Sequence, residues 1–306
     1  MKRLTIAVVV MMAVCPVLSA VDNGYSLVDI SVACVRENPA HSAELGSQQL
    51  MGFPVKVLSR SGEWSEVETF DGYHGYIINN SLTALSPEMY DRWRRSDRVI
   101  FTDFEESKIW ADTLKQAVVG DIVPGVILQA EKTSGSWCAV SLPDGRNGFV
   151  EAVSVTELVN WASQDFSPEK ILSFARSLYG SPYLWGGTSV KGLDCSGLTW
   201  NAYFLNGRVL KRNASAQALM ADKKITDISL MSPADLLFFV SKTGRVNHVA
   251  LYEGNGRYIE SSGHVRHSSL VQGDELYHPS RFSFSISLSN LAPVIDSSVR
   301  EWFFKD

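Results

Sequence analysis

The feature that most constrains the fold is an internal duplication in the first half of the chain. Three landmarks recur after the same displacement of 73 residues: a tryptophan, an Asp-Gly pair and a Gly-aromatic pair. They are Trp64, Asp71-Gly72 and Gly75-Tyr76 in the first copy, and Trp137, Asp144-Gly145 and Gly148-Phe149 in the second. Both copies consist of short Val, Ile and Leu runs interrupted by Gly, Pro and Asp, which is typical of small antiparallel barrels. The sequence therefore predicts two similar β-domains in tandem.

The landmarks of each copy resemble bacterial SH3-like domains, whose signature is a tryptophan strand, an Asp-Gly turn and a closing Gly-aromatic strand. By this resemblance the two copies span residues 24–87 and 98–158. The connector from Pro87 to Arg98 is charged, and we expect it to be helical or extended. Its short basic cluster, residues 92–95, is expected to be a solvated helix face or connector.

A glycine-rich turn at residues 182–187 is followed, at residues 192–198, by a cysteine at the start of a predicted helix. Asp194 or the residue just before it can act as the N-cap, and apolar residues then recur at helical spacing over 198–205. A thiol in the first helical turn lies near the positive end of the dipole, which favours the nucleophilic thiolate. The N–H groups of that turn can also hold an oxyanion beside the sulfur. Cys195 is therefore the candidate nucleophile.

A base for this thiol is predicted further along the chain. Residues 246–252 predict a strand carrying His248, and a turn at Asn255-Gly256 leads to a second strand that carries Glu260. A histidine on a buried strand beside a polar group is how a Cys–His pair is oriented. The register stays open: a two-residue turn puts Glu260 opposite Leu251, whereas a longer loop or a bulge brings it to His248.

Taken together, Asp-Cys-Ser-Gly at 194–197 and Asn-His-Val-Ala at 247–250 resemble the NlpC family of papain-fold cysteine peptidases, which cut bacterial cell-wall peptides. The resemblance covers residues 165–306. It implies a multidomain α+β protein in which two small SH3-like β-barrels precede a papain-like peptidase domain. It makes Cys195 the nucleophile and His248 the general base.

The resemblance also implies roles for residues around this pair. The third catalytic position, often histidine in the family, is Glu260 here, and a carboxylate can orient and stabilise an imidazolium. His264, four residues further on, is the alternative third residue. Tyr183 is expected to aim its hydroxyl into the oxyanion site, and Trp185 to wall the substrate groove.

Two SH3-like domains ahead of such a peptidase resemble the γ-D-glutamyl-L-diamino-acid endopeptidases of cell-wall recycling. In those enzymes the first SH3-like domain closes one end of the groove, which then admits only peptides with a free N-terminal L-alanine. The resemblance implies that Asp194 pairs with that ammonium, assisted by Ser196. It also implies that Glu44 and Tyr73 cap the groove. The family usually has an Arg-x-Ser motif after the catalytic helix. Here residues 212–215 are Arg-Asn-Ala-Ser, so the serine is absent from its usual place and Ser215 is the candidate to replace it.

The N-terminus reads as a targeting signal. Residues 1–3 are basic at Lys2 and Arg3, residues 4–18 are apolar and residues 19–20 are small, which matches a secretory signal peptide of residues 1–20. The apolar run is too short for a convincing membrane span. Lipidation at Cys15 is disfavoured because bulky Val14 precedes it. We therefore expect an exported, periplasmic protein with no transmembrane segment.

Composition and the positions of the cysteines argue against nucleic-acid binding and against a metal site. The net charge of −5 and the lack of a long Lys/Arg cluster argue against nucleic-acid binding. No pair of cysteines has metal-ligand spacing and the histidines form no zinc pattern, so no metal or cofactor is expected. Cys34 and Cys138 fall in different predicted domains, and we expect two buried thiols rather than a disulfide.

These observations favour a monomeric hydrolase of murein peptides that cuts the γ-D-glutamyl-L-diamino acid bond, with diaminopimelate as the diamino acid. Two alternatives stay open. One is an enzyme of the same fold that acts on the stem peptides of intact peptidoglycan. The other is a non-catalytic wall-binding protein in which the duplicated domains are the functional part.

Overall fold

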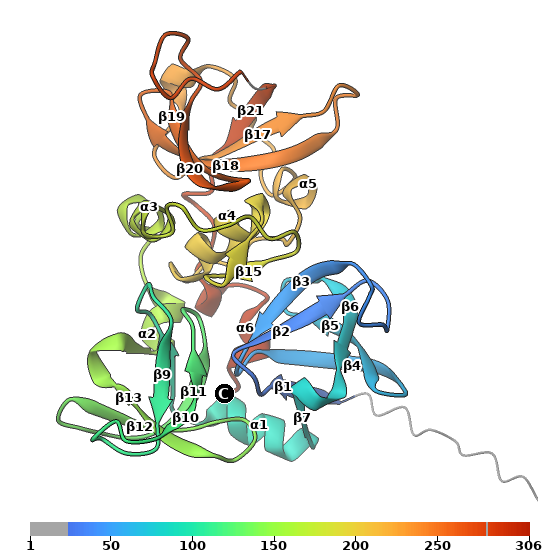
Figure 1. The fold of residues 1–306 in the computed structure, drawn as a ribbon, viewed down its shortest axis with the longest axis vertical. Helices are drawn as coiled ribbons and strands as arrows, with labels where there is room; N and C mark the ends of the chain where they lie inside the picture. Colours follow the sequence, from blue (N-terminus) through green and yellow to red (C-terminus); the bar gives the residue numbers. More distant parts are fainter. Residues whose placement is uncertain (1–23, 280) are drawn as a thin grey trace, which may run out of the picture.

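The computed structural model describes residues 24–279 and 281–306 and arranges them as two β-barrels joined to an α+β domain (Figure 1). The expected signal peptide, residues 1–20, lies outside the described residues. Each barrel is built on a seven-stranded sheet, and the α+β domain on a five-stranded one. The fold class expected from the sequence is confirmed.

The first barrel is an antiparallel sheet in the order β3-β2-β6-β5-β4-β1-β7. Its strands are β1 (Tyr25–Val28), β2 (Val32–Arg36), β3 (Leu45–Leu50), β4 (Pro54–Ser61), β5 (Trp64–Thr69), β6 (His74–Ile78) and β7 (Leu82–Leu85). Small aliphatic side chains fill its core: Val28, Ala33, Val35, Val55, Val57, Val67 and Ile77. Between β5 and β6 the chain reverses at Gly72, whose φ of +80° is a conformation that glycine adopts without strain.

The second barrel repeats this topology strand for strand, in the order β10-β9-β13-β12-β11-β8-β14. Its strands are β8 (Arg98–Phe101), β9 (Ser107–Trp110), β10 (Val118–Ile122), β11 (Ile127–Ser134), β12 (Trp137–Ser141), β13 (Asn147–Glu151) and β14 (Val155–Glu157). Trp64 pairs with Ile78 in the first barrel, and Trp137 pairs with Glu151 in the second. The 73-residue displacement in the sequence thus reflects the same strand pairing in both barrels.

The connector between the barrels is helix α1 (Pro87–Arg95), which packs against the C-terminal helix α6 (Arg300–Phe303). Tyr90 and Trp93 of α1 are buried, and the Tyr90 hydroxyl donates to the Trp302 carbonyl of α6 at 2.7 Å. The Arg94 Nη1 atom donates to the Glu301 carbonyl at 2.8 Å. Arg92 and Arg95 of the basic cluster are exposed, as expected for a solvated helix face, while Tyr90 and Arg94 contact the end of the chain.

The α+β domain places helices against one face of an antiparallel sheet in the order β20-β19-β18-β17-β21 (Figure 1). Its longer elements are α2 (Leu158–Ser163), α3 (Pro168–Ser177), α4 (Cys195–Phe204), α5 (Ala214–Gln217), β17 (Leu236–Val240), β18 (Val246–Gly254), β19 (Arg257–Ser262), β20 (His264–Ser269) and β21 (Phe282–Ile286). A small hairpin precedes α4, formed by β15 (Thr188–Ser189) and β16 (Gly192–Leu193). Short 3₁₀ helices also occur: η1 (Asn79–Ser81) and η2 (Ala152–Ser154) lie in the barrels, and η3 (Ile228–Leu230) and η4 (Val294–Asp296) lie in the α+β domain.

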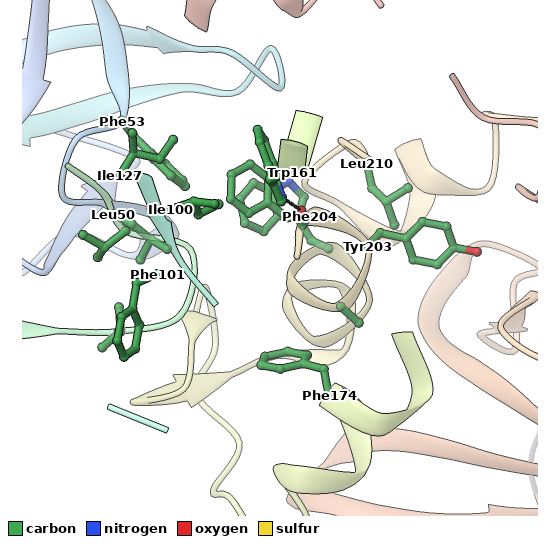
Figure 2. Packing of buried hydrophobic residues seen from close by; sticks show 14 of the residues in the cluster. Leu50, Phe53, Ile100, Phe101, Ile127, Trp161, Phe174, Tyr203, Phe204 and Leu210 are labelled. Carbon is green, nitrogen blue, oxygen red and sulfur yellow. Dashed lines mark hydrogen bonds between the residues drawn. The ribbon is translucent and has the colours of Figure 1, made fainter. Parts of the chain in front are cut away.

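One hydrophobic core runs through all three units, and helix α4 lies at its centre. Every residue of α4 is buried, and Phe204 near its end stacks on Trp200 with ring centroids 4.9 Å apart. Figure 2 shows Phe204 beside Trp161 of α2, facing the barrel residues Phe53 and Ile127. Because burial of large aromatic side chains dominates packing energy, this shared core fixes the barrels relative to α4.

Polar contacts fix the edge of the first barrel beside the start of α4. Gln48 on β3 is buried, and its Oε1 accepts hydrogen bonds from the Thr188 N–H at 2.9 Å and the Ser189 hydroxyl at 3.2 Å. The Gln48 carbonyl also accepts from the Thr188 hydroxyl at 3.1 Å. Strand β3 is therefore held against the hairpin that leads into α4.

The three described cysteines are all free thiols. Cys138 is buried as expected, but the expectation for Cys34 is wrong, because its side chain is exposed. Strand β2 alternates inward Ala33 and Val35 with an outward Cys34, so the period of the strand places the thiol on the surface. Within residues 24–279 and 281–306, no helix has the length and apolar character needed to cross a membrane.

Candidate active site

Cys195 is the first residue of helix α4, where the preceding loop is held tightly to the helix. Asp194 is the N-cap, and its Oδ1 accepts a hydrogen bond from the Gly197 N–H at 2.7 Å. A Cβ atom at Gly197 would collide with the Gly187 carbonyl, so only glycine allows the glycine-rich turn to lie this close. The thiol is 8% exposed and faces a cavity at the positive end of the helix dipole.

His248 and Glu260 lie on adjacent strands and are joined side chain to side chain. Strand β18 pairs with β19 in the register Leu251 opposite Ile259, with an irregularity at the hairpin end. Glu260 is therefore diagonal to His248 on the same face of the sheet. This register lies between the two alternatives from the sequence, which put Glu260 opposite Leu251 or opposite His248. The His248 Nε2 and Glu260 Oε2 atoms are 2.6 Å apart, which leaves Nδ1 of the imidazole for Cys195.

His248 and Glu260 each shift the pKa of the other. Burial alone would lower the pKa of His248, but hydrogen bonds to Cys195 and Glu260 outweigh burial and raise that pKa to about 9. Burial would likewise raise the pKa of Glu260, but the hydrogen bond and charge of His248 lower it to about 2. At neutral pH the site thus holds an imidazolium between the Cys195 sulfur and the Glu260 carboxylate.

His264, the alternative third residue, lies elsewhere. It begins strand β20, is exposed, and forms a backbone bridge with Pro182. Over the described part of the chain, no hydrogen bond or ion pair joins His264 to His248. The structure therefore brings Glu260, and not His264, to the imidazole.

A cavity of about 300 Å³ opens in front of Cys195 and is walled by two domains. The nucleophile and the substrate-binding residues named from the peptidase domain line it: Tyr183, Trp185, Asp194, Cys195 and Ser196. His248 and Glu260 are not among its lining residues. The first barrel contributes Glu44 and Tyr73, the two barrel residues named by the family resemblance. Trp185 is 61% exposed, and its Nε1 donates to Glu44 Oε1 at 2.7 Å across the domain boundary.

Glu37 is a lining residue that the sequence analysis missed. Its Oε1 accepts a hydrogen bond from the Tyr73 hydroxyl. Burial, together with the Glu37 hydrogen bond and charge, raises the pKa of Tyr73, so its hydroxyl stays protonated. A Cβ atom at Gly46 would collide with both the Tyr73 hydroxyl and Glu37, so this glycine keeps the acidic end of the cavity open.

Arg212 is a second residue that the sequence analysis did not place in the site. Its Nη2 donates to Asp194 Oδ2 at 2.6 Å and its Nη1 to Asp194 Oδ1 at 3.1 Å, with both side chains buried. Asp194 accepts three more hydrogen bonds, from the Ser196 hydroxyl and the Gly186 and Gly197 N–H groups. Arg212 also donates to Ser47 of the first barrel at 3.2 Å. This pair therefore ties the loop around Cys195 to the barrel.

Tyr183 lies beside the thiol on the glycine-rich loop. Burial raises the pKa of Tyr183, and the charges of Cys195 and Asp194 raise it further. Its hydroxyl therefore keeps its proton at neutral pH and can donate to an oxyanion. Among the residues that the structure describes, no group of three or more His, Cys, Asp or Glu side chains could hold a metal ion.

Two family models match this chain, one in the peptidase domain and one in the first barrel. The model of the NlpC/P60 family matches residues 180–279, a range that contains Cys195, His248 and Glu260. The model described as the bacterial dipeptidyl-peptidase Sh3 domain matches residues 35–82, a range that contains the barrel residues of the cavity.

Two curated relatives are similar over most of their length. Dipeptidyl-peptidase 6 of Lysinibacillus sphaericus is 32% identical over 266 residues, which are 82% of this chain and 94% of that protein. The gamma-D-glutamyl-L-lysine dipeptidyl-peptidase of Bacillus subtilis is 35% identical over 230 residues, 70% of this chain and 71% of that protein.

The fold has a close counterpart among solved structures. The crystal structure of an NlpC/P60 family protein from Bacillus cereus superposes with a TM-score of 0.74, covering 88% of this chain and all of that one at 20% identity. A similar fold is found in an NlpC/P60 endopeptidase from Photobacterium damselae, with a TM-score of 0.66 and 15% identity over 89% of this chain and 74% of that one. The architecture, the matched ranges and the curated relatives together show that the chain belongs to the NlpC/P60 family of cysteine peptidases.

Proposed function

We propose that this protein hydrolyses murein peptides between the γ-carboxyl of D-glutamate and the following diamino acid, in peptides with a free N-terminal L-alanine. The observation that carries the proposal is the Cys195–His248–Glu260 alignment at a cavity whose far end is walled by acidic residues of the first barrel. The relatives named as dipeptidyl-peptidases and the signal-like N-terminus support turnover of such peptides outside the cytoplasm. We propose that this takes place in the periplasm and that the protein acts as a monomer.

In the proposed mechanism Cys195 Sγ attacks the γ-carbonyl carbon of D-glutamate while His248 carries the proton. The backbone N–H of Cys195 and the hydroxyl of Tyr183 stabilise the oxyanion of the tetrahedral intermediate. His248 then donates its proton to the amine of the diamino acid, the C–N bond breaks, and a thioester remains on Cys195. Water attacks the thioester and gives its proton to His248, and L-Ala-D-Glu leaves as the free acid.

The acidic end of the cavity suits the ammonium group of the N-terminal L-alanine. Glu44 and Glu37 supply carboxylates from the first barrel, and Tyr73 supplies a hydroxyl between them. Asp194 and Ser196 complete this wall from the helix side. Because Arg212 already pairs with Asp194, we assign the larger share of ammonium binding to the barrel carboxylates, and a supporting share to Asp194.

Replacing Glu260 by glutamine should slow turnover and shift its pH dependence. We expect kcat to fall by about 10- to 100-fold, because one charge-assisted hydrogen bond to the imidazolium is lost. Glu260 helps to raise the pKa of His248 to about 9, so its neutralisation lowers that pKa and activity is lost at lower pH on the alkaline side. The measurement is kcat against pH between 5 and 10. An unchanged alkaline limb would assign the third role to another group.

Blocking the substrate ammonium should prevent cleavage. We expect N-acetylation of L-Ala-γ-D-Glu-diaminopimelate to lower kcat/KM by about 100-fold or more, because the acetylated nitrogen carries no charge for Glu44 and Glu37 to bind and the acetyl group adds bulk at that end of the cavity. Glu44→Gln should raise KM for the free peptide about tenfold and leave the acetylated peptide nearly unaffected.

The matched control is Glu63→Gln, which removes an exposed carboxylate from the same barrel away from the cavity and should leave KM unchanged. Equal rates on free and acetylated peptides would reject the amine-reading end wall and favour an enzyme of intact stem peptides.

A further inference from the structure

Glu260 lies on the middle of three paired strands, and its two carboxylate oxygens face different neighbours. Oε2 faces β18, where it is 2.6 Å from His248 Nε2. Oε1 faces β20, where it accepts hydrogen bonds from the Ser268 hydroxyl at 2.8 Å and the Arg266 Nε at 3.0 Å. The carboxylate is thus held from the side opposite to the imidazole by two donors.

The strand register explains why these donors meet the same oxygen. Glu260 is directly opposite Arg266 in the β19–β20 pair, and the next pair on that face joins Tyr258 and Ser268. The side chain of Glu260 is 5% exposed, whereas that of Arg266 is 27% exposed. Ser268 is buried. The contacts therefore reach a desolvated carboxylate, where charge-assisted hydrogen bonds are strong.

We propose that Arg266 and Ser268 are positioning residues that act on His248 through Glu260. This inference rests on the catalytic roles proposed above. The terminal torsion of a glutamate side chain is broad, so one hydrogen bond to the imidazole does not fix the carboxylate plane. Two donors on Oε1 fix that plane and keep Oε2 directed at Nε2.

Charge balance gives Arg266 a second effect. The charged or titratable groups facing Glu260 and His248 are Cys195 from α4 and Arg266 from β20, in addition to the pair itself. A thiolate and an imidazolium balance each other, which leaves the buried carboxylate to be balanced by the guanidinium. A buried carboxylate without such a partner takes up a proton more readily. Arg266 therefore keeps Glu260 ionised at the acidic end of the pH range.

A competing role for Arg266 is direct binding of a substrate carboxylate, because part of its side chain is exposed. The two roles differ in measurable ways. A substrate-binding arginine raises KM and acts independently of Glu260. A positioning arginine lowers kcat, shifts the acid limb of the pH profile and has no separate effect once Glu260 is neutral.

The test uses Arg266→Met in the full chain, with Cys34→Ser to remove the exposed thiol. We expect kcat on the tripeptide to fall about tenfold with KM changed less than about twofold. Loss of the guanidinium raises the pKa of Glu260 from about 2, so the acid limb, followed down to about pH 2, should move up by about one pH unit. The rate at which iodoacetamide alkylates Cys195, located by peptide mapping, should show the same shift.

Three further variants make the test specific. Arg266→Lys keeps the charge and should return the acid limb to its native position, and Ser268→Ala should lower kcat in the same direction by a smaller factor. Arg257→Met removes an arginine at the start of β19 that pairs with Asp274 at the surface, and it should match the native enzyme. In the Glu260→Gln background, Arg266→Met should cost less than about twofold.

A raised KM with an unmoved acid limb, or a full tenfold loss on top of Glu260→Gln, would overturn the inference. The alkylation profile needs no substrate, so it decides the role of Arg266 even if the tripeptide is not cut. Failure of the proposed substrate and failure of the positioning role therefore give different results.

Discussion

Replacing Cys195 by alanine is expected to reduce kcat on the free tripeptide by about 10⁵-fold or more, to the level of the uncatalysed background. The change removes only the sulfur atom, so His248 and Tyr183 keep their places but have no acyl group to act on. The side chain is small and helix α4 is buried along its length, so the fold should remain intact. Product release followed by mass spectrometry, with circular dichroism for the fold, measures both effects.

The matched control for this variant is Cys34→Ser, which removes the exposed thiol of the first barrel. It should retain native kcat and KM, because Cys34 faces solvent on β2 and does not line the cavity. Turnover by Cys195→Ala within about 100-fold of the native rate would contradict the proposed nucleophile.

Replacing Asp194 by alanine is expected to give the largest loss of stability among the cavity residues, about 3–5 kcal/mol of unfolding free energy. Asp194 is the partner of buried Arg212, and its removal leaves a guanidinium that is desolvated and unpaired. The same change removes the N-cap of α4 and the acceptor for the Gly186 N–H. Urea denaturation followed by circular dichroism gives the free energy of unfolding.

Two variants separate the buried pair from ordinary surface pairs. Lys191→Ala breaks an ion pair with Asp121 near the same domain junction, and because both side chains are about one-third exposed it should cost at most about 1 kcal/mol. Arg212→Met combined with Asp194→Ala should be more stable than Asp194→Ala alone, since no charge is then left unpaired. A cost below that of Lys191→Ala would contradict this account of Asp194.

Local signals were enough to predict the parts of the site that depend on nearby sequence. The N-cap at Asp194 and the glycines before it placed Cys195 at the start of α4, because a helix start is determined within a few residues. The 73-residue repeat likewise predicted two barrels, because a turn and its flanking strands form one local unit.

The features that the sequence left open or missed depend on contacts between distant segments. The position of Glu260 followed from a hairpin register with an irregularity that turn residues alone do not determine. Arg212 became part of the site only because the first barrel and the loop before α4 enclose it. Glu37 became visible through its contact with Tyr73, 36 residues further along the chain.

The acidic lining of the cavity connects the fold to its proposed selectivity. The shared core and the Gln48 contacts hold the first barrel against the start of α4, so Glu44 meets Trp185 across the boundary. A barrel tethered only by a flexible linker could not keep this end of the cavity closed. The position of the barrel is thus part of the proposed active site.

The most direct test of the central claim is to identify which bond of L-Ala-γ-D-Glu-diaminopimelate, or of its L-lysine analogue, is broken. The native protein and Cys195→Ala are incubated with each peptide, and the products are identified by mass spectrometry. We expect the native protein to release L-Ala-D-Glu and the free diamino acid, and Cys195→Ala to release neither. Release of free L-alanine with an intact D-Glu-diamino acid product, or equal cleavage by Cys195→Ala, would contradict the claim.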